Sequence, residues 1–291
     1  MHWQKVTLVG LGLLGGSLGL SIKRGRLAAK VCGLVRRPAS IAECQRLGVV
    51  DECVSDLAPA VNNADLIILC TPLSQMFPLA RQMLPYLKPG VIVTDVGSVK
   101  APLVRDLEPL LAAHQAHFVG SHPMAGGEKT GVNAAREDLF KDAVVAITPT
   151  SRTDCQAVKK IEMLWSSLGS RVLRLSPEAH DDLVSRSSHL VHVVAAGLAS
   201  YVLSPIHPKE QAALCANGFK DTTRIASGSP EMWRDIAMNN QGNLARVLGV
   251  FIEDLQEFRL ALDNGDQAAI LEFFEKARQR REKWRANQGV E

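Results

Sequence analysis

The sequence has few features of a membrane, nucleic-acid-binding or disulfide-rich protein. It contains no apolar run near 18 residues and no signal peptide, so we expect a soluble, cytoplasmic protein. The formal net charge is only +3 and the charges are spread evenly, which does not indicate nucleic-acid binding. The 6 cysteines show no metal-binding or redox spacing, and no bound metal is expected. Internal repeats and low-complexity linkers are also absent.

The amino terminus carries a glycine pattern typical of dinucleotide binding. A short apolar run at 6–9 leads into Gly10-x-Gly12-x-x-Gly15, and a helical pattern opens directly after it. The first glycine permits a tight turn, the second lets the backbone approach the phosphates, and the third lets the helix pack on the strand. The helix start offers free N–H groups to the pyrophosphate. The predicted contacts here are Gly10, Gly12, Leu13, Leu14 and Gly15. The alternative is a glycine-rich turn without a ligand.

The end of the second predicted strand favours NADP over NAD. Roughly 20 residues beyond the fingerprint, an NAD site usually carries Asp or Glu for the ribose hydroxyls. Here that place is Val35, followed by Arg36 and Arg37. A guanidinium pair binds a 2′-phosphate, which a carboxylate would repel. NAD stays possible, because both arginines could instead form a solvated strand end. Thr71 and Pro72 complete the predicted cofactor contacts.

Strands and helices alternate through the first half of the chain. The apolar runs are continuous, which indicates strands buried on both faces, as in a parallel sheet. Helical stretches such as 78–87 lie between them. The pattern predicts a doubly wound, Rossmann-type α/β domain over residues 1–176. The runs lie at 6–9, 31–35, 66–70, 91–96, 117–120, 143–148 and 171–175.

From about Pro177 no strand-like run appears, which predicts an all-helical domain over residues 177–291. One of its helices carries an apolar seam with alternating spacings of four and three, and Asn264-Gly265 closes it. The seam suits packing against a second subunit, so a homodimer is expected; packing within one chain is the alternative. Its members are Leu244, Leu248, Phe251, Leu255, Phe258 and Leu262.

Two polar residues follow predicted strands of the first domain. Ser98 lies where ligands of open α/β sheets bind, although it could instead cap the next helix. His122, held between Gly120 and Pro123, lies at the same edge. An imidazole, with an ordinary pKa of about 6.5, suits the removal of a proton from a hydroxyl. Considered alone, His122 could also be structural.

The helix predicted over 178–203 opens the second domain and carries a polar stripe. The members recur at spacings of four, four and three, which places them on one face. They are Asp181, Ser185, His189 and His192. A cap or a solvated face explains Asp181 well, whereas the two histidines, which lie among apolar residues, favour a wet cleft.

Arg224 is a candidate partner for a substrate carboxylate. An ordinary salt bridge to Asp221 is the alternative.

Together these motifs resemble the prephenate/arogenate dehydrogenases of tyrosine biosynthesis. The resemblance covers essentially the whole chain, and the four later motifs are far more specific than the glycine fingerprint. The motifs are Val-Gly-Leu-Gly-Leu-Leu-Gly-Gly-Ser at 9–17, Thr-Asp-Val-Gly-Ser-Val-Lys at 94–100, Gly-Ser-His-Pro-Met-Ala-Gly at 120–126, Ser-His-Leu-Val-His at 188–192 and Asp-Thr-Thr-Arg-Ile-Ala at 221–226.

The resemblance implies a Rossmann-type domain, a helical dimerisation domain, and NAD(P)-dependent oxidative decarboxylation of a cyclohexadienol. It implies that His122 bonds the ring hydroxyl and helps to remove its proton, and that Ser98 bonds the same hydroxyl and orients the nicotinamide. Arg224 then holds a substrate carboxylate. His192 lies near the substrate side chain, with His189 lining the same pocket.

The resemblance also places Glu128 and Asp181 at acidic positions associated with gating or interdomain contacts, and we count both among the substrate-binding candidates. Prephenate is slightly favoured over arogenate, because His192 offers a donor or cation that suits a keto acid. A β-hydroxyacid dehydrogenase is less favoured, since no lysine stands on the polar face of the helix over 178–203. A non-catalytic NADP sensor is the alternative from another class.

Overall fold

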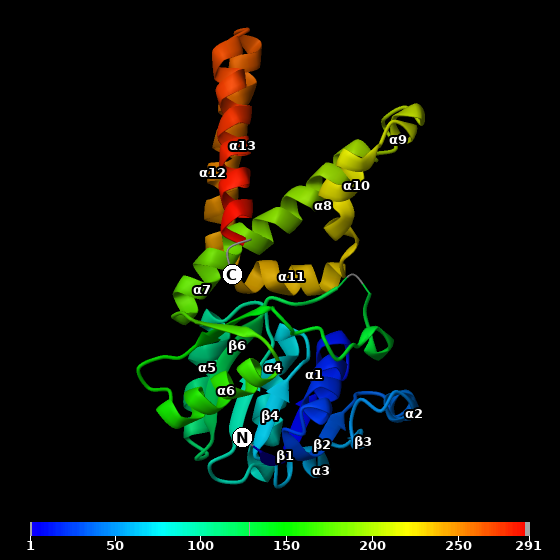
Figure 1. Ribbon diagram of the computed structural model, residues 1–291, viewed down its shortest axis with the longest axis vertical. Coiled ribbons are helices and arrows are strands. Elements are labelled where there is room, and N and C mark those ends of the chain that lie inside the picture. Colours follow the sequence, from blue (N-terminus) through cyan, green and yellow to red (C-terminus); the bar gives the residue numbers. More distant parts are fainter. Residues whose placement is uncertain (1, 128, 289–291) are drawn as a thin grey trace. The chain divides into compact units, whose positions relative to one another are not determined.

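The computed structural model describes residues 2–127 and 129–288. Its sheet has eight strands in the order β3-β2-β1-β4-β5-β6-β7-β8 (Figure 1). From β3 to β6 the neighbouring strands are parallel. The strands are β1 (Trp3–Val9), β2 (Ala28–Leu34), β3 (Glu52–Val54), β4 (Leu66–Leu69), β5 (Ile92–Asp95), β6 (His117–Pro123), β7 (Val144–Thr148) and β8 (Arg171–Arg174).

The strand order reverses direction between β1 and β4. The chain builds outward from β1 through β2 to β3, and then returns to β4 on the other side of β1. In such sheets ligands bind beyond the carboxyl ends of the strands at this switch point. The glycine fingerprint follows β1, and Thr71 follows β4, so the order brings the two predicted cofactor segments to one edge.

Helices cover both faces of the sheet and bury a separate apolar core on each. One core contains Leu18 of α1 and Trp165 of α6, while the other contains Met76 of α4 and Leu107 of α5. Successive residues of β4 alternate between the two cores, as the pleat requires. The helices are α1 (Leu13–Arg24), α2 (Ala39–Arg46), α3 (Leu57–Val61), α4 (Leu73–Met83), α5 (Ala101–Ala112) and α6 (Cys155–Ser167).

One ladder differs from the expectation of a parallel sheet. β7 runs antiparallel to β6, with Gly120 opposite Thr148 and Pro123 opposite Val145. A parallel neighbour needs a crossover, usually a helix. In the described part of the connection from β6 to β7 the only helical element is the short 3-10 turn η2 (Val132–Ala134). The continuous apolar run at 143–148 reports burial on both faces but carries no information on direction.

The helix expected over 78–87 begins earlier than predicted. α4 starts at Leu73 and contains Pro78, and the 3-10 helix η1 (Leu84–Tyr86) follows it. Proline is a common first residue of a helix, which made Pro78 a plausible start. Its missing N–H removes only one bond from this helix, so α4 continues through it.

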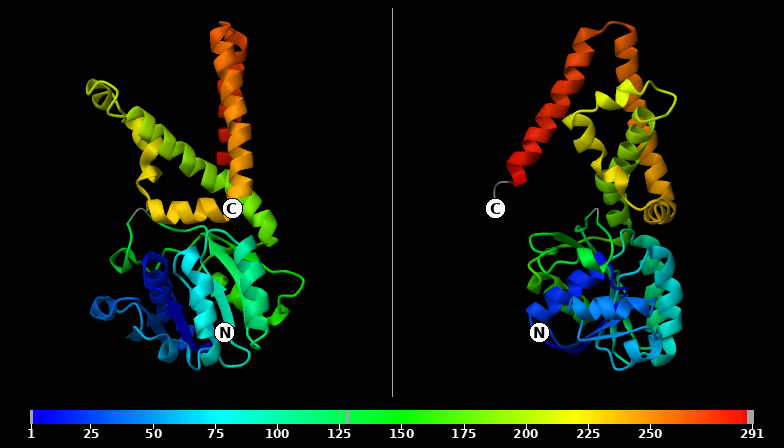
Figure 2. Two further views of the ribbon diagram at one scale, coloured as in Figure 1. Left: turned by 180° about the vertical axis from the view of Figure 1, so that it is seen from behind. Right: turned by 90° about the vertical axis from the view of Figure 1, so that its right-hand side faces the viewer.

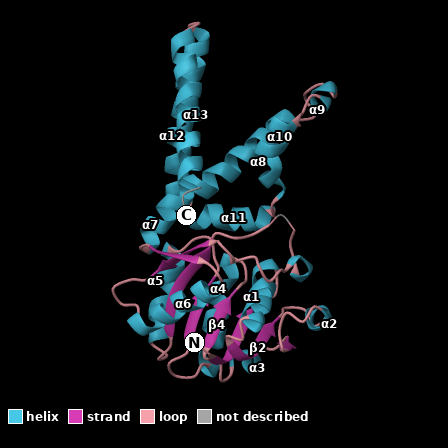
Figure 3. Cartoon of the chain, viewed as in Figure 1, coloured by secondary structure: helices cyan, strands magenta, loops and turns pink. Residues whose placement is uncertain are grey.

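The segment after β8 is helical (Figure 3). Its first part, up to Gln241, belongs to the same compact unit as the sheet. Ser74 of α4 donates a hydrogen bond of 2.6 Å to Asp235 of α11 and helps to join the two parts. The elements are α7 (Pro177–Val184), the π-helical turn η3 (Ser185–His189), α8 (Leu190–Val202), α9 (Glu210–Ala213), α10 (Asn217–Thr223), the 3-10 turn η4 (Arg224–Ser227) and α11 (Pro230–Asn239).

A second compact unit, Gly242–Glu291, contains most of α12 (Gln241–Asp263) and all of α13 (Gln267–Gln288) (Figure 2). Phe258 contacts Phe273 with ring centroids 4.6 Å apart. Gly265, at φ +63°, ends the first helix as predicted. Of the apolar seam, Leu255 and Leu262 are exposed. No described helix, including these two long ones, is both long and apolar enough to cross a membrane.

Gly19 allows α1 to approach the backbone of Val49. A methyl group at Gly19 would lie 2.0 Å from the carbonyl oxygen of Val49, so the helix or the loop would have to move. We expect Gly19→Ala to lower the free energy of unfolding by about 2–3 kcal/mol. The matched control is Gly197→Ala in α8, where the new methyl meets no atom within 4 Å. That change should raise stability by up to about 1 kcal/mol. Urea unfolding followed by circular dichroism measures both, and equal midpoints would contradict the close-packing explanation.

Candidate active site

The glycine loop after β1 fits a dinucleotide pyrophosphate. Gly10 has φ +98°, and a methyl group there would lie 3.1 Å from the carbonyl oxygen of Cys70. A methyl on Gly15 would lie 2.0 Å from the carbonyl oxygen of Gly10. Gly12 is different, because a methyl there meets no atom within 4 Å. The turn therefore needs two of the glycines for its own packing, and the third borders open space at the start of α1.

A second observation at this edge also fits a bound cofactor. The hydroxyl oxygen of Thr71 is buried and has no hydrogen-bond partner among the described residues. It lies beside Gly10, whose added methyl would meet the Thr71 methyl group at 3.0 Å. Pro72 is exposed at the start of α4, and Arg36 and Arg37 are exposed just beyond β2. Thr71 and the glycine loop thus lie together at the switch point of the sheet, and Arg36 and Arg37 follow the neighbouring strand β2.

A buried ion pair holds the loop between β5 and α5. The side chains of Asp95 and Lys100 are both fully buried and in direct contact. Asp95 also accepts from the backbone N–H groups of Gly97 (2.7 Å) and Ser121 (3.0 Å), while Lys100 donates to the carbonyl oxygen of Ser121 (2.8 Å). Burial raises the pKa of Asp95 and lowers the pKa of Lys100, and their mutual attraction opposes both shifts. The pair fastens this loop to β6.

Ser98 lies within the loop that this pair holds. It is half-buried, and α5 begins only at Ala101. The amino terminus of α5 is capped from outside, because Asp181 accepts from the N–H groups of Lys100 (2.7 Å) and Ala101 (2.8 Å). The alternative in which Ser98 caps this helix is therefore wrong, and its hydroxyl is left at the ligand edge of the sheet.

His122, near the end of β6, lies in the same neighbourhood. It is buried, with 8% of its surface exposed. Its Nδ1 lies 2.9 Å from Nε2 of His180, and the two rings meet edge to face. Burial lowers the pKa of His122 well below its usual value, and the neighbouring His180, Lys100 and His189 add to this. His122 is therefore a neutral imidazole at pH 7.

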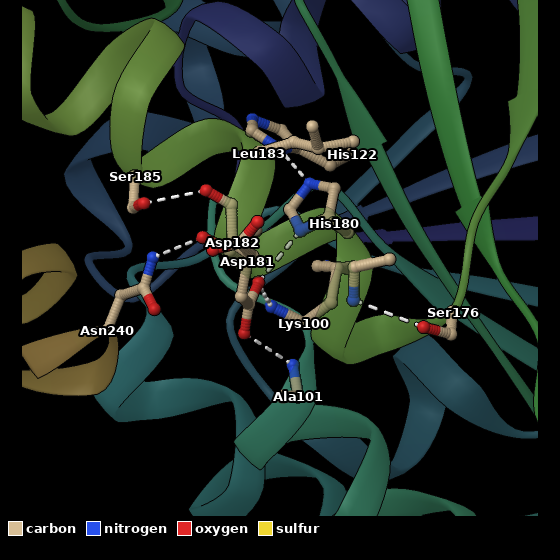
Figure 4. A network of polar contacts seen from close by, with 12 residues as sticks. Lys100, Ala101, His122, Ser176, His180, Asp181, Asp182, Leu183, Ser185 and Asn240 are labelled. Carbon is tan, nitrogen blue, oxygen red and sulfur yellow. Dashed lines mark hydrogen bonds and ion pairs between the residues drawn. The ribbon is translucent and has the colours of Figure 1, made fainter. Parts of the chain in front are cut away.

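His180 is the residue that the sequence did not reveal. It lies one position before Asp181, outside the polar stripe that the spacing indicated, and it is fully buried. Its Nδ1 lies 2.8 Å from Oδ1 of Asp181 (Figure 4). The only signal in the sequence is a histidine directly beside an acidic residue at the start of a helix. The structure thereby forms a chain from His122 through His180 to Asp181.

The π-helical turn η3 interrupts the helix that was expected to run without a break from 178 to 203. Asp181, Ser185 and His189 are all buried, so a solvated face is excluded for them. Asn240 joins this turn to α7, since its side-chain amide donates to the carbonyl oxygen of Asp181 (2.8 Å) and to Nδ1 of His189 (3.1 Å). Burial lowers the pKa of His189 to about 4. Its Nε2 is buried without a partner among the described residues.

His192 lies on an aromatic platform that the sequence analysis also missed. Its ring stacks on Trp233 with centroids 3.7 Å apart and planes at 28°. Its Nδ1 donates to the carbonyl oxygen of Ser188 at 3.0 Å, and burial lowers its pKa. Arg224, the first residue of η4, is exposed. Glu128 lies outside the described residues, and the substrate contacts of Arg224, His189, His192 and Asp181 stay predictions.

Fold and site together define a dinucleotide-dependent dehydrogenase with a buried histidine near the carboxyl edge of its sheet. A family model described as the nucleotide-binding domain of prephenate dehydrogenase matches residues 18–174, and one described as its dimerization domain matches residues 176–276. The chain belongs to the prephenate dehydrogenase family. It is an NAD(P)-dependent enzyme of the prephenate/arogenate type, as its motifs predicted.

Individual relatives agree with this assignment. A prephenate dehydrogenase of Bacillus subtilis is 33% identical over 280 residues, which are 95% of this chain and 75% of the relative. A cyclohexadienyl dehydrogenase of Zymomonas mobilis is 34% identical over 282 residues, 96% of this chain and 95% of the relative. The crystal structure of prephenate dehydrogenase from A. aeolicus with hydroxyphenyl propionate and NAD+ matches with a TM-score of 0.90 and 32% identity, covering 97% and 99% of the two chains. The predicted combination of a Rossmann-type domain and a helical domain is confirmed.

The buried ion pair gives a stability prediction. Asp95→Asn leaves the ammonium of Lys100 buried without its counter-charge, so we expect the free energy of unfolding to fall by about 3–5 kcal/mol. Arg186→Ala is the matched control, because it breaks an exposed pair with Asp182 on α7 and should cost less than about 1 kcal/mol. Thermal and urea unfolding of the three proteins measure the difference. Similar losses in the two variants would show that the Asp95–Lys100 pair is not needed for the fold.

Proposed function

We propose that the chain converts prephenate to 4-hydroxyphenylpyruvate, using NADP in preference to NAD. The observation that carries the proposal is the neutral, buried His122, whose Nδ1 is occupied by His180. This leaves Nε2 as the nitrogen that accepts a proton. A base of this kind at the ligand edge of a nucleotide-binding sheet suits the oxidation of a hydroxyl-bearing substrate.

In this proposal each residue has a defined task. A nicotinamide cofactor held by the glycine loop and Thr71 would supply the hydride acceptor for oxidation of the substrate ring. His122 removes the proton of the ring hydroxyl, and Ser98 bonds the same oxygen and positions the nicotinamide. Arg224 holds a substrate carboxylate, and His189 and His192 line the pocket around the side chain. Loss of carbon dioxide creates an aromatic ring, which makes the step effectively irreversible.

The relatives support a ring substrate with a three-carbon acid side chain. The A. aeolicus enzyme was crystallised with hydroxyphenyl propionate, and the Bacillus subtilis relative is named a prephenate dehydrogenase. One observation favours arogenate as a second candidate. His192 uses its Nδ1–H on Ser188, so the neutral ring offers Nε2 as an acceptor, which suits an ammonium group better than a keto group.

The same proposal includes a homodimer that acts in the cytoplasm, with the domain boundary at 176/177. The match of 176–276 to a dimerization domain supports the dimer. So do the exposed apolar side chains of the second compact unit, among them Leu255, Leu262 and Leu271. Apolar side chains gathered on a helical hairpin are typical of a surface that a second subunit covers.

His122→Asn tests the assignment of the base. We expect kcat to fall by about 100-fold or more, because an amide does not accept the hydroxyl proton. The affinity for NADP should change little, since the cofactor contacts lie after β1, β2 and β4. Reduced-cofactor formation at 340 nm, measured with both substrates and both cofactors, gives kcat and KM, and fluorescence titration gives the affinity. A fully active His122→Asn enzyme would remove His122 from this role.

Replacement of both Arg36 and Arg37 by alanine tests the cofactor preference. The double variant should lose affinity for NADP by about tenfold or more, because two charge-assisted bonds to the 2′-phosphate are removed. Its affinity for NAD should stay within about threefold, since NAD lacks that phosphate. Calorimetric titration of both cofactors is the measurement. Parallel losses for the two cofactors, or none, would contradict the NADP assignment.

A further inference from the structure

The hydrogen-bonded series from His122 through His180 to Asp181 ends on a firmly held carboxylate. Oδ1 of Asp181 accepts from the N–H of Lys100 (2.7 Å) and lies 2.8 Å from Nδ1 of His180, and Oδ2 accepts from the N–H of Ala101 (2.8 Å). The two backbone donors belong to the amino terminus of α5, where the helix dipole stabilises a negative charge. The two main-chain donors therefore hold the carboxylate of Asp181 in a fixed orientation.

The carboxylate of Asp181 determines which ring nitrogens of neutral His180 and His122 carry a hydrogen. A carboxylate only accepts, so Nδ1 of His180 must carry its hydrogen and donate it to Asp181. In neutral His180 the other nitrogen, Nε2, is then bare and must accept. The contact of 2.9 Å with His122 therefore requires that Nδ1 of His122 carries a hydrogen. Nε2 of His122 is left with a lone pair, which is the form that a general base needs.

We propose that His180 and Asp181 are positioning residues that hold His122 in its Nδ1–H tautomer. His180 then receives the Nδ1 proton of His122 during turnover. This inference rests on the proposed function of His122 as the base. The substrate O–H bond breaks and an Nε2–H bond forms on His122. The Nδ1–H bond of His122 then breaks as an Nε2–H bond forms on His180. The positive charge ends on His180, beside the carboxylate of Asp181, and no further reactant is needed.

The surroundings explain why such a transfer is useful. A proton on His122 would face Lys100, at the amino end of α5, and His189 in η3, and both disfavour a cation there. The charge of Lys100 is balanced by Asp95 of β5, which also accepts from the N–H groups of Gly97 and Ser121. Asp181 is the acidic group in contact with His180. Moving the charge from His122 to His180 thus places it in direct contact with a counter-charge, the carboxylate of Asp181.

The tautomer can be measured without substrate. In the full-length chain with 15N-labelled imidazoles, long-range 15N–1H correlation spectra distinguish a protonated from a bare ring nitrogen. The His122→Asn spectrum identifies the His122 signals among the 8 histidines. We expect Nδ1 protonated and Nε2 bare. A hydrogen on Nε2 of His122 in the folded wild type would overturn the proposal.

Two replacements of His180 separate orientation from proton transfer. Glutamine places an amide oxygen near the position of Nε2, so His180→Gln should keep the tautomer of His122 but lower kcat by about tenfold. Asparagine reaches only Asp181, so His180→Asn should leave His122 in mixed tautomers and lower kcat by about 100-fold. The KM of the substrate should stay within about twofold in both. His114→Asn, at an exposed position, is the control and should match the wild type.

The pH profile gives a readout that a packing role would not move. The base works only when unprotonated, so kcat falls as pH drops through the pKa of His122. If His180 acted only as a neighbouring charge, which lowers the pKa of His122, its removal would move the acid limb of His180→Asn to higher pH. The relay predicts the opposite, because the variant lacks the acceptor that stabilises the proton on His122, so the limb should move to lower pH. An unmoved limb, or a His180→Asn enzyme with wild-type kcat, would overturn the relay.

The outcomes distinguish this inference from the proposed function. A wild-type chain that holds the Nδ1–H tautomer but turns over neither prephenate nor arogenate would refute the function and leave the tautomer assignment standing. Normal turnover with the opposite tautomer would refute the relay alone. Circular dichroism and NADP titration of each variant show whether it is folded, and the wild-type spectrum decides the tautomer even if a variant is not.

Discussion

The buried pair of Asp95 and Lys100 is the interaction on which the site depends. It joins the end of β5, the backbone of Ser121 in β6 and the start of α5. Ser98 lies on the loop between the two charges, and His122 is the neighbour of Ser121. The two residues that would meet the substrate hydroxyl are therefore held by one pair. Because an unpaired charge at full burial is strongly destabilising, the pair excludes other arrangements of this loop.

A second constraint joins the helical segment to the sheet. Asp181 caps α5 with both carboxylate oxygens, and its neighbour His180 reaches His122. One turn of α7 thus completes a helix of the nucleotide-binding part and supports its histidine. This explains why residues up to Gln241 form one compact unit with the sheet although their sequence character changes near Pro177. The site is built where the two sequence patterns meet.

Much of the fold could be predicted, because burial leaves a strong pattern. Seven of the eight strands correspond to the apolar runs; β3 was missed because a strand of 3 residues at the sheet edge leaves almost no pattern. The direction of β7 was not predictable, since a strand buried on both faces has the same composition in either direction. The π-helical turn η3 was missed for a related reason: it inserts one residue per turn without changing which residues are apolar.

The sequence by itself determined the nucleotide-binding loop, the class of fold and the choice of His122 as the candidate base. These depend on local chemistry: a turn that only glycine permits, strands that must be apolar, and a histidine between glycine and proline near the end of a strand. Only the tertiary structure decided the partners of that histidine. His180 and Asp181 lie about sixty residues away in the chain, and Lys100 and Asn240 approach from other elements. A hydrogen bond depends on distances of about 3 Å between atoms that folding brings together, and sequence spacing does not encode such distances.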